Sequence, residues 1–372
     1  PAGSWPEARF GLALAPPDPR GARRLVAYAS HLELADLARV SVLSESLPEE
    51  SKTLLGRLRP RGLLREVELA YHPDRAGAAR FYLKADVDSV CVQRSPAIPG
   101  VERLSGMLET DAEKGRLRLS GGPLQIDAST HFNSPLRLEG EVGWHALADG
   151  WRIYTPHLEV ENPDLRLRIM GDIIMREGRA AAAGLWAGID QGRISGLAKY
   201  LPSDLPSKGR EWLSQALQAG TIGSGAVVLR GPLDRFPFDR DEGRFAAEIN
   251  LTGGILEYSK HWPRIEGIDA QVTLDGRELR VAARAATTYG VRLADVSARI
   301  PDLGVSQRHV IVRGRASGTA SDMQRFVANS PLRSGMGRRI MPLEIGGEAR
   351  LDLDMNIPLY PQKGTVAGAL TF

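Results

Sequence analysis

Cysteine occurs only once in this sequence, at Cys91. A single thiol excludes an internal disulfide and leaves too few thiolates for a cysteine-ligated metal cluster. Sparse cysteine is compatible with the cytosol and also with a bacterial periplasm, where stray thiols would be oxidised. Because Cys91 lies in an alternating segment with no histidine nearby, we expect an inert buried thiol and not a nucleophile.

A large charge imbalance and long apolar runs are also missing. Lys and Arg number 48 and Asp and Glu number 45, so the net charge is only +3 over 372 residues. This balance argues against a nucleic-acid-binding surface. The longest uncharged apolar run, Ala180–Ile189, is half of the ~20 residues that a membrane-spanning helix needs. Aromatic residues make up 6% of the chain beside 40 glycines, which favours many strands and turns over a helical bundle.

Motifs of enzyme chemistry are scarce as well. No two of the seven histidines have the spacing that places metal ligands on one helix face, so neither a metal nor a cofactor is expected. No Gly-x-Ser-x-Gly elbow occurs. The glycine-rich segment Gly220–Gly225 lacks the lysine of a phosphate-binding loop and precedes a strand pattern. We therefore predict a turn there.

Paired carboxylates are the one catalytic candidate. Glycosidases use two such groups on a sheet, which keeps an envelope-glycan hydrolase open as an alternative. Each pair nevertheless alternates with apolar residues and so falls on the polar side of its strand, where a solvated surface is the simpler interpretation. The pairs are Asp86/Asp88, Glu159/Glu161 and Asp352/Asp354.

What the sequence does contain, from Leu63 onward, is apolar residues at every second position. This period predicts antiparallel strands with one apolar and one polar face, about eighteen of them, separated by Gly, Asp, Asn and Pro. The fold class is therefore mainly β. The apolar face of these strands is assigned to Phe81, Leu83, Val87, Leu117, Leu119, Leu136, Leu138, Leu165, Leu167, Ile169, Phe245, Ala247, Ile249, Leu251, Leu351, Leu353 and Met355.

Short helical segments interrupt the strand pattern. Apolar residues at three- and four-residue steps predict helices between Arg23 and Leu58. Weak internal repeats, such as Arg80-Phe81 and Arg244-Phe245, support tandem units that each begin with a helical segment. The predicted organisation is helical or loop segments at 1–62, 191–222 and 317–344, β units at 63–190 and 223–316, and the start of a third β unit at 345–372.

Strands with one apolar face require a cover for that face. The few predicted helices are too short to cover about eighteen strands. Two arrangements remain: ordinary β-sandwiches with self-filled cores that act as a passive scaffold, or sheets curled into an elongated groove whose apolar side is open. An open apolar groove suits acyl chains.

The segment from Tyr200 to Leu332 carries a distinctive order of motifs. It includes Tyr200-Leu201-Pro202, Trp212-Leu213, Leu229-Arg230-Gly231, Phe236-Pro237-Phe238, Leu256-Glu257-Tyr258, Trp262-Pro263-Arg264-Ile265, Ile300-Pro301-Asp302-Leu303 and Ser330-Pro331-Leu332. This order resembles the YhdP family of Gram-negative envelope proteins, AsmA-like members of the bridge-like lipid transfer proteins. The motifs cover about a third of the chain.

The resemblance implies a repeating β-groove that conducts phospholipid between the inner and outer membranes. It implies a periplasmic body on a long, inner-membrane-anchored protein, with no catalytic motif and no cofactor. The sequence starts at Pro1, and Thr365–Phe372 has the pattern of an unfinished strand. We therefore expect an internal periplasmic fragment that holds acyl chains, with membrane contact made by parts absent here. The resemblance favours the groove over the sandwich.

Two motifs of the resemblance have competing interpretations. Phe236-Pro237-Phe238 and Trp262-Pro263 could line a lipid path or pack at corners. Proline removes a donor from the strand ladder and is tolerated at strand starts and edges. Corner and edge packing is therefore the favoured prediction for both motifs.

Overall fold

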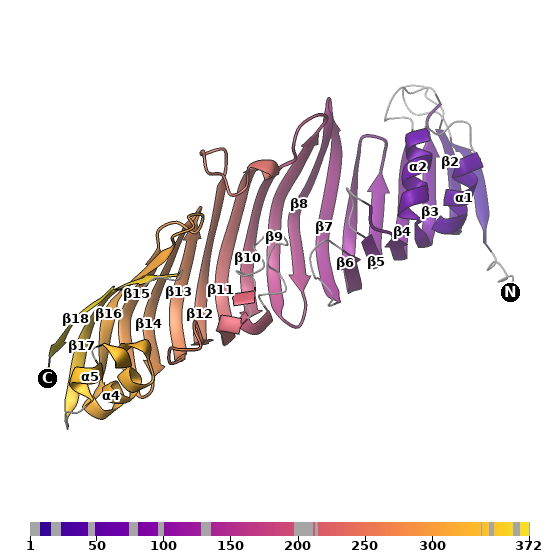
Figure 1. The fold of residues 1–372 in the computed structure, drawn as a ribbon. Helices are drawn as coiled ribbons and strands as arrows, with labels where there is room; N and C mark the ends of the chain where they lie inside the picture. The colour runs from indigo at the N-terminus through magenta and orange to yellow at the C-terminus, as the bar shows by residue number, and fades with distance from the viewer. Residues whose placement is uncertain are drawn as a thin grey trace. The chain divides into compact units, whose positions relative to one another are not determined.

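The computed structural model shows a mainly β chain with few helices, as the alternation predicts (Figure 1). Eighteen strands are present among the described residues. The described residues are 8–15, 24–43, 49–73, 81–95, 100–127, 135–196, 211–212, 215–335, 337–341, 346–359 and 365–371.

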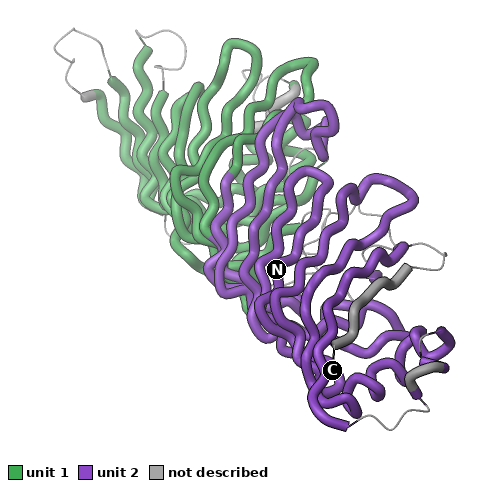
Figure 2. The backbone as a smooth tube through the Cα atoms, turned by 90° about the vertical axis from the view of Figure 1, so that its left-hand side faces the viewer, with its two compact units in different colours: residues 1–163, 168–185 green, residues 164–167, 186–372 purple. Residues whose placement is uncertain are grey.

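The chain divides into two compact units (Figure 2). Unit 1 comprises residues 1–163 and 168–185. Within it, β1 to β8 pair antiparallel in chain order, each strand with the next. These strands are β1 Phe10–Ala15, β2 Arg24–Glu33, β3 Arg61–Tyr71, β4 Phe81–Val92, β5 Gly100–Thr110, β6 Lys114–Asp127, β7 Leu136–Leu147 and β8 Gly150–Glu161.

Unit 2 comprises residues 164–167 and 186–372, and its strands β11 to β18 also pair antiparallel in chain order. Two further strands, β9 Leu165–Arg176 and β10 Ala182–Arg193, pair with each other and contribute residues to both units. The strands of unit 2 are β11 Leu217–Pro232, β12 Arg244–Leu256, β13 Ile265–Asp275, β14 Glu278–Thr288, β15 Val291–Ile300, β16 His309–Thr319, β17 Glu348–Pro358 and β18 Thr365–Thr371.

The helices are short and stand between strands. In unit 1, α1 Leu34–Leu43 and α2 Glu49–Leu58 connect β2 to β3, and α1 packs on both of these strands. In unit 2, α4 Ala320–Ala328, the 3-10 turn η4 Pro331–Ser334 and α5 Gly337–Ile340 connect β16 to β17. Helix α4 begins with a capping hydrogen bond from the Asp322 amide to the Thr319 hydroxyl, 3.1 Å long.

Two local predictions from the sequence are wrong. The helical prediction for Arg23–Leu58 fails over residues 24–33, which form β2. Leu25, Tyr28 and Leu32 fit a helical period, but alternation fits the same ten residues, and pairing with β1 and β3 selects the strand. The turn predicted at Gly220–Gly225 is instead part of β11, where irregular register against β12 accommodates the glycines.

β-Bulges bend many of the strands. In unit 1 the register shifts on β3, β4 and β5 coincide with three non-glycine residues of positive φ, Glu66 (46°), Ser89 (53°) and Arg103 (62°). In unit 2 the shift between β15 and β16 coincides with Asp295 (50°). A bulge bends its strand and increases the twist, so a series of bulges curves the sheet that contains it.

Gly140 tests how strongly the pairing of β7 with β8 depends on one particular glycine. Its φ is 140°, and an added Cβ would clash with the backbone carbonyl of His157 on β8. We expect Gly140→Ala to lower the stability of unit 1 by about 1–3 kcal/mol, seen as a lower urea midpoint and faster hydrogen exchange in β7 and β8. Gly122→Ala is the control, because nothing lies within 4 Å of a Cβ there. Equal stability of the two variants would contradict this role.

Candidate functional site

An unbroken row of apolar side chains crosses unit 2. Direct cross-strand pairing joins six residues on β12 to β17, and every one of them is half-buried. None of the six carries a charge or a polar side-chain atom capable of strong hydrogen bonding. The row is Ile249, Val272, Val281, Ala298, Val312 and Met355.

Unit 1 carries large apolar side chains that are more exposed. Leu69 and Tyr71 are each 38% exposed and pair with Leu83 and Phe81, so they share the apolar face of β4. On β1, Phe10, Leu12 and Leu14 project to the same face and are 66–73% exposed. Contiguous exposed apolar surface of this kind is a candidate interaction surface.

The same face is well buried beside the bulges. Leu64 and Val67 flank the bulge at Glu66, and Val87 and Val90 flank the one at Ser89. All four belong to one buried cluster, so side chains from both sides of each bulge meet. The apolar face of unit 1 is therefore buried beside these bulges and more exposed at Leu69 and Tyr71.

Unit 2 has its own buried cluster. Ile222 is 1% exposed, and Leu251 and Ile268 are also buried. Ile249 lies two residues before Leu251 on the same face of β12. It is only half-buried and packs against this cluster. Each unit thus combines a cluster of buried apolar side chains with partly exposed apolar side chains beside it.

All seventeen residues assigned from alternation lie on strands. Four of them are buried: Val87, Leu119, Leu136 and Leu251. The other thirteen are half-buried. Their neighbours on the opposite face, such as Lys84, Arg168 and Glu248, are exposed. The assignment of these residues to lipid contact remains a prediction.

The sequence assignment omitted several members of the apolar rows. Val272, Val281, Ala298 and Val312 complete the row of unit 2, and Leu108 and Val142 pair with Leu117 in unit 1. Alternation of apolar and polar residues indicated some of them in the sequence, because Val272 and Leu274 alternate with Gln271 and Thr273. Register between strands, which alternation does not reveal, shows that they form continuous rows.

On the polar face, ion pairs connect side chains of neighbouring strands. Arg116 donates to Glu109 at 2.6 Å, and Arg118 pairs with Glu141 at 3.2 Å. The hydrogen bond from Arg116 holds the pKa of Glu109 below its usual range. Such exposed pairs contribute little individually, but they keep this face hydrated and separate from the apolar one.

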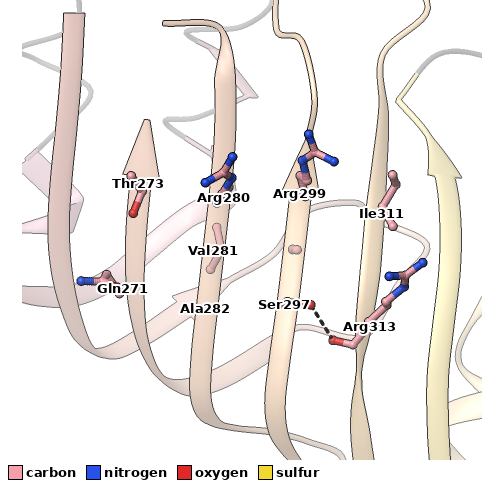
Figure 3. Close-up of a pocket in the computed structure, with 10 residues that line it drawn as sticks. Gln271, Thr273, Arg280, Val281, Ala282, Ser297, Arg299, Ile311 and Arg313 are labelled. Carbon is pink, nitrogen blue, oxygen red and sulfur yellow. Dashed lines mark hydrogen bonds between the residues drawn. The ribbon is translucent and has the colours of Figure 1, made fainter. Parts of the chain in front are cut away.

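A shallow hollow of about 480 Å³ lies mainly on the polar face of β13 to β16 (Figure 3). Ala282 and Ser297 leave space between longer side chains, among them Arg280, Arg299 and Arg313. Glu278 accepts from both Arg280 and Arg299, while Arg313 lies 3.5 Å from Asp354. Two carboxylates thus offset part of the charge of the three arginines, and the hollow has the character of a polar, hydrated sheet surface.

The carboxylate pairs do not have the environment of a general acid. Asp352 and Asp354 are exposed, and a hydrogen bond from Arg65 lowers the pKa of Asp88. Hydrogen bonds from arginine also hold the pKa of Glu109, Asp149, Asp239 and Glu278 below the usual range, whereas a general acid requires a raised pKa. No group of three or more metal-ligating side chains occurs within the described ranges.

The aromatic motifs take different places. Trp262 lies between Tyr258 and Phe326 of α4, with ring centroids 6.0 and 6.2 Å apart, and Pro263 is buried. Burial raises the pKa of Tyr258. This motif therefore joins the β12–β13 connection to α4, which is the packing role predicted for it. Tyr200-Leu201-Pro202 lies outside the described residues.

Comparisons with known proteins bear on what the apolar face binds. A family model described as YhdP protein matches residues 2–372. The intermembrane phospholipid transporter YhdP of Escherichia coli (strain K12) is 23% identical over 377 residues, a stretch that covers 99% of this chain. The chain spans 30% of the length of that relative. No solved structure matches. Within the described residues, no helix combines the length and apolar character needed to span a bilayer.

Proposed function

The chain belongs to the YhdP family, and we propose that it binds phospholipid by its acyl chains along the apolar face of its sheets. One observation carries the proposal: this face stays partly exposed across whole rows of paired strands, while the opposite face is polar and charged. The row from Ile249 to Met355 offers six similar contacts in succession. Similar weak sites without charges let a lipid move along the row without being trapped at one position.

The predicted groove is the form that this binding takes. Bulges increase the bend and twist of strands, and the buried apolar residues beside the bulges of unit 1 support a sheet that curves around its apolar face. Acyl chains on that surface would gain ~25 cal/mol for each Å² of apolar area removed from water. A self-filled sandwich would bury these residues fully, whereas thirteen of the seventeen assigned positions remain half-exposed. This exposure supports the groove over the passive scaffold.

The cellular setting of the proposal follows the relative's printed function. The relative's printed name is that of an intermembrane phospholipid transporter. We place this chain in the periplasm, as the lipid-conducting part of an inner-membrane-anchored protein. The chain itself supplies the apolar path. Head groups stay at the open side of the groove, in contact with water.

Lipid occupancy of the purified chain tests the proposal. We expect phospholipid or detergent to remain bound after purification, detected by native mass spectrometry and by extraction with organic solvent. The binding should involve acyl chains, so detergents with long alkyl tails should compete and head-group analogues should not. A chain that purifies without lipid, and takes up none from added vesicles, would contradict lipid binding and favour the self-filled scaffold.

Asp352→Asn combined with Asp354→Asn tests the hydrolase alternative. Both side chains are exposed on the polar face of β17, so we expect lipid occupancy and thermal stability to stay unchanged, within about 0.5 kcal/mol. The double variant is compared with the wild-type chain for bound lipid and for hydrolysis of envelope glycans. A glycan-hydrolysing activity in the wild-type chain that disappears in the double variant would show that the non-enzymatic assignment is wrong.

A further inference from the structure

The connection between β11 and β12 carries two phenylalanines with different surroundings. After Pro232 the chain makes one 3-10 turn, η3 Leu233–Arg235, and then presents Phe236 and Phe238. The Phe236 ring meets Phe238 at 5.9 Å and Phe245 at 5.2 Å between centroids, both edge-to-face. Phe245 is one of the residues assigned to the apolar face, so the connection reaches that face.

Phe238 anchors this connection. It is only 7% exposed and lies over Gly231 and Gly243. A Cβ on Gly231 would be 2.9 Å from Phe238 Cε1, and one on Gly243 would be 2.7 Å from Phe238 Cδ1. The two glycines are two residues beyond Leu229 and two before Phe245, so they continue the apolar face of β11 and β12. The anchor therefore folds the connection onto the apolar side of the strand ends.

Phe236 is held on this anchored connection but is not buried by it. Its exposed fraction is 48%, although its ring contacts two other aromatic rings. A large apolar side chain that is held in place and left half-exposed has already lost much of its rotational freedom. Contact with an apolar ligand would then carry little additional ordering cost.

Charged groups lie immediately beside this aromatic pair. Arg277, in the turn between β13 and β14, hydrogen-bonds Asp239 of the same connection and lies 3.8 Å from Asp302. The end of the apolar face therefore changes from aromatic to ionic within a few residues. Such a boundary matches a molecule that has an acyl chain joined to a polar head group.

We propose that Phe236 is a lipid-contacting residue at the rim of the groove. There it extends the apolar surface of Phe245 beyond the start of β12. The ligand class is a phospholipid acyl chain close to its head group. This inference rests on the proposed lipid-binding function and adds a specific contact to it. It also divides the Phe-Pro-Phe motif: Phe238 serves the corner packing predicted from sequence, and Phe236 serves binding.

Site-specific crosslinking separates this inference from the function on which it rests. A photoreactive phenylalanine analogue is placed at 236, 249 or 248 of the 372-residue chain, which is then loaded with phosphatidylethanolamine–phosphatidylglycerol vesicles and irradiated. We expect lipid adducts at 236 and 249 and none at 248. Adducts at 249 without adducts at 236 would overturn the rim contact and leave lipid binding intact. No adduct at either position would overturn both.

A pair of alanine variants provides a second, independent test. Phe236→Ala should reduce retained lipid by roughly three- to tenfold at limiting lipid concentration, with a much smaller fall in melting temperature than Phe238→Ala causes. Phe236→Leu should restore most of the binding, because it restores apolar area. Phe238→Ala should lower the melting temperature, since it empties a buried site. If Phe236→Ala lowers the melting temperature as Phe238→Ala does, with normal lipid retention, Phe236 is a packing residue and the inference is wrong.

Discussion

Replacing Ile249 with aspartate is expected to abolish lipid transport while leaving the protein folded. Ile249 is the first residue of the apolar row of unit 2, and it pairs with Val272 on β13 and with Gly225 on β11. Desolvating an unpaired carboxylate beside acyl chains costs several kcal/mol, which corresponds to roughly a hundredfold or greater loss of occupancy at that position. Because the side chain is half-buried, the new carboxylate can reach water in the lipid-free state.

Glu248→Lys is the matched control for this substitution. Glu248 is the adjacent residue of the same strand, is exposed, and accepts a hydrogen bond from Gln271 at 2.8 Å. Reversing its charge changes only the hydrated face, so transport and expression should stay close to wild type. The measurement is phospholipid transfer between membranes in cells, with protein amount followed by immunoblot. Normal transfer by the Ile249→Asp variant would contradict a lipid path on this face.

Aspartate at Ile222 should have the opposite consequence and unfold unit 2. Ile222 pairs with Leu251 and is 1% exposed, and its side chain fills the space over Gly192. A charge there has no route to water, so soluble expression should be lost. The milder Ile222→Ala should cost about 2–5 kcal/mol of stability, measured by urea unfolding of the purified chain.

Comparing Ile222→Asp with Ile249→Asp distinguishes the buried apolar cluster of unit 2 from the partly exposed positions beside it. Ile222 and Ile249 are both isoleucines of unit 2, on neighbouring strands, and both contribute to the same cluster. If Ile222→Asp were tolerated, or if Ile249→Asp unfolded the chain in the same way, the two positions would have equal burial in solution. That result would contradict the distinction between the buried cluster and the lipid-contacting surface.

Alternation was enough to predict most of the strands from Leu63 onward, because a residue's side of a strand follows from its position. Phe81 and Leu83 are half-buried while Tyr82 and Lys84 between them are exposed, as the sequence indicates. Alternation does not identify a strand where a helical period and a strand period both fit the same segment. Residues 24–33 have apolar residues at helical steps, and only pairing with β1 and β3 selects the strand.

The bends could not be predicted from residue type. Glu66, Ser89 and Arg103 have positive φ values although none is a glycine or an asparagine, the residues that adopt this conformation most readily. Register with the neighbouring strands imposes the conformation, and register is a long-range property. The continuity of the apolar row through Val281 and Val312 depends on the same register, which is why the sequence assignment contained only parts of it.

A photocrosslinking scan along β12, from position 245 to position 251, tests lipid contact on the apolar face most directly. Each position carries the same photoreactive side chain, and phospholipid adducts are quantified by mass spectrometry. We predict adducts that alternate with a period of two, present at 245, 247 and 249 and absent at 246, 248 and 250, with a weaker signal at the buried position 251. Adducts confined to 246, 248 and 250, or the same yield at every position, would contradict a lipid-binding apolar face.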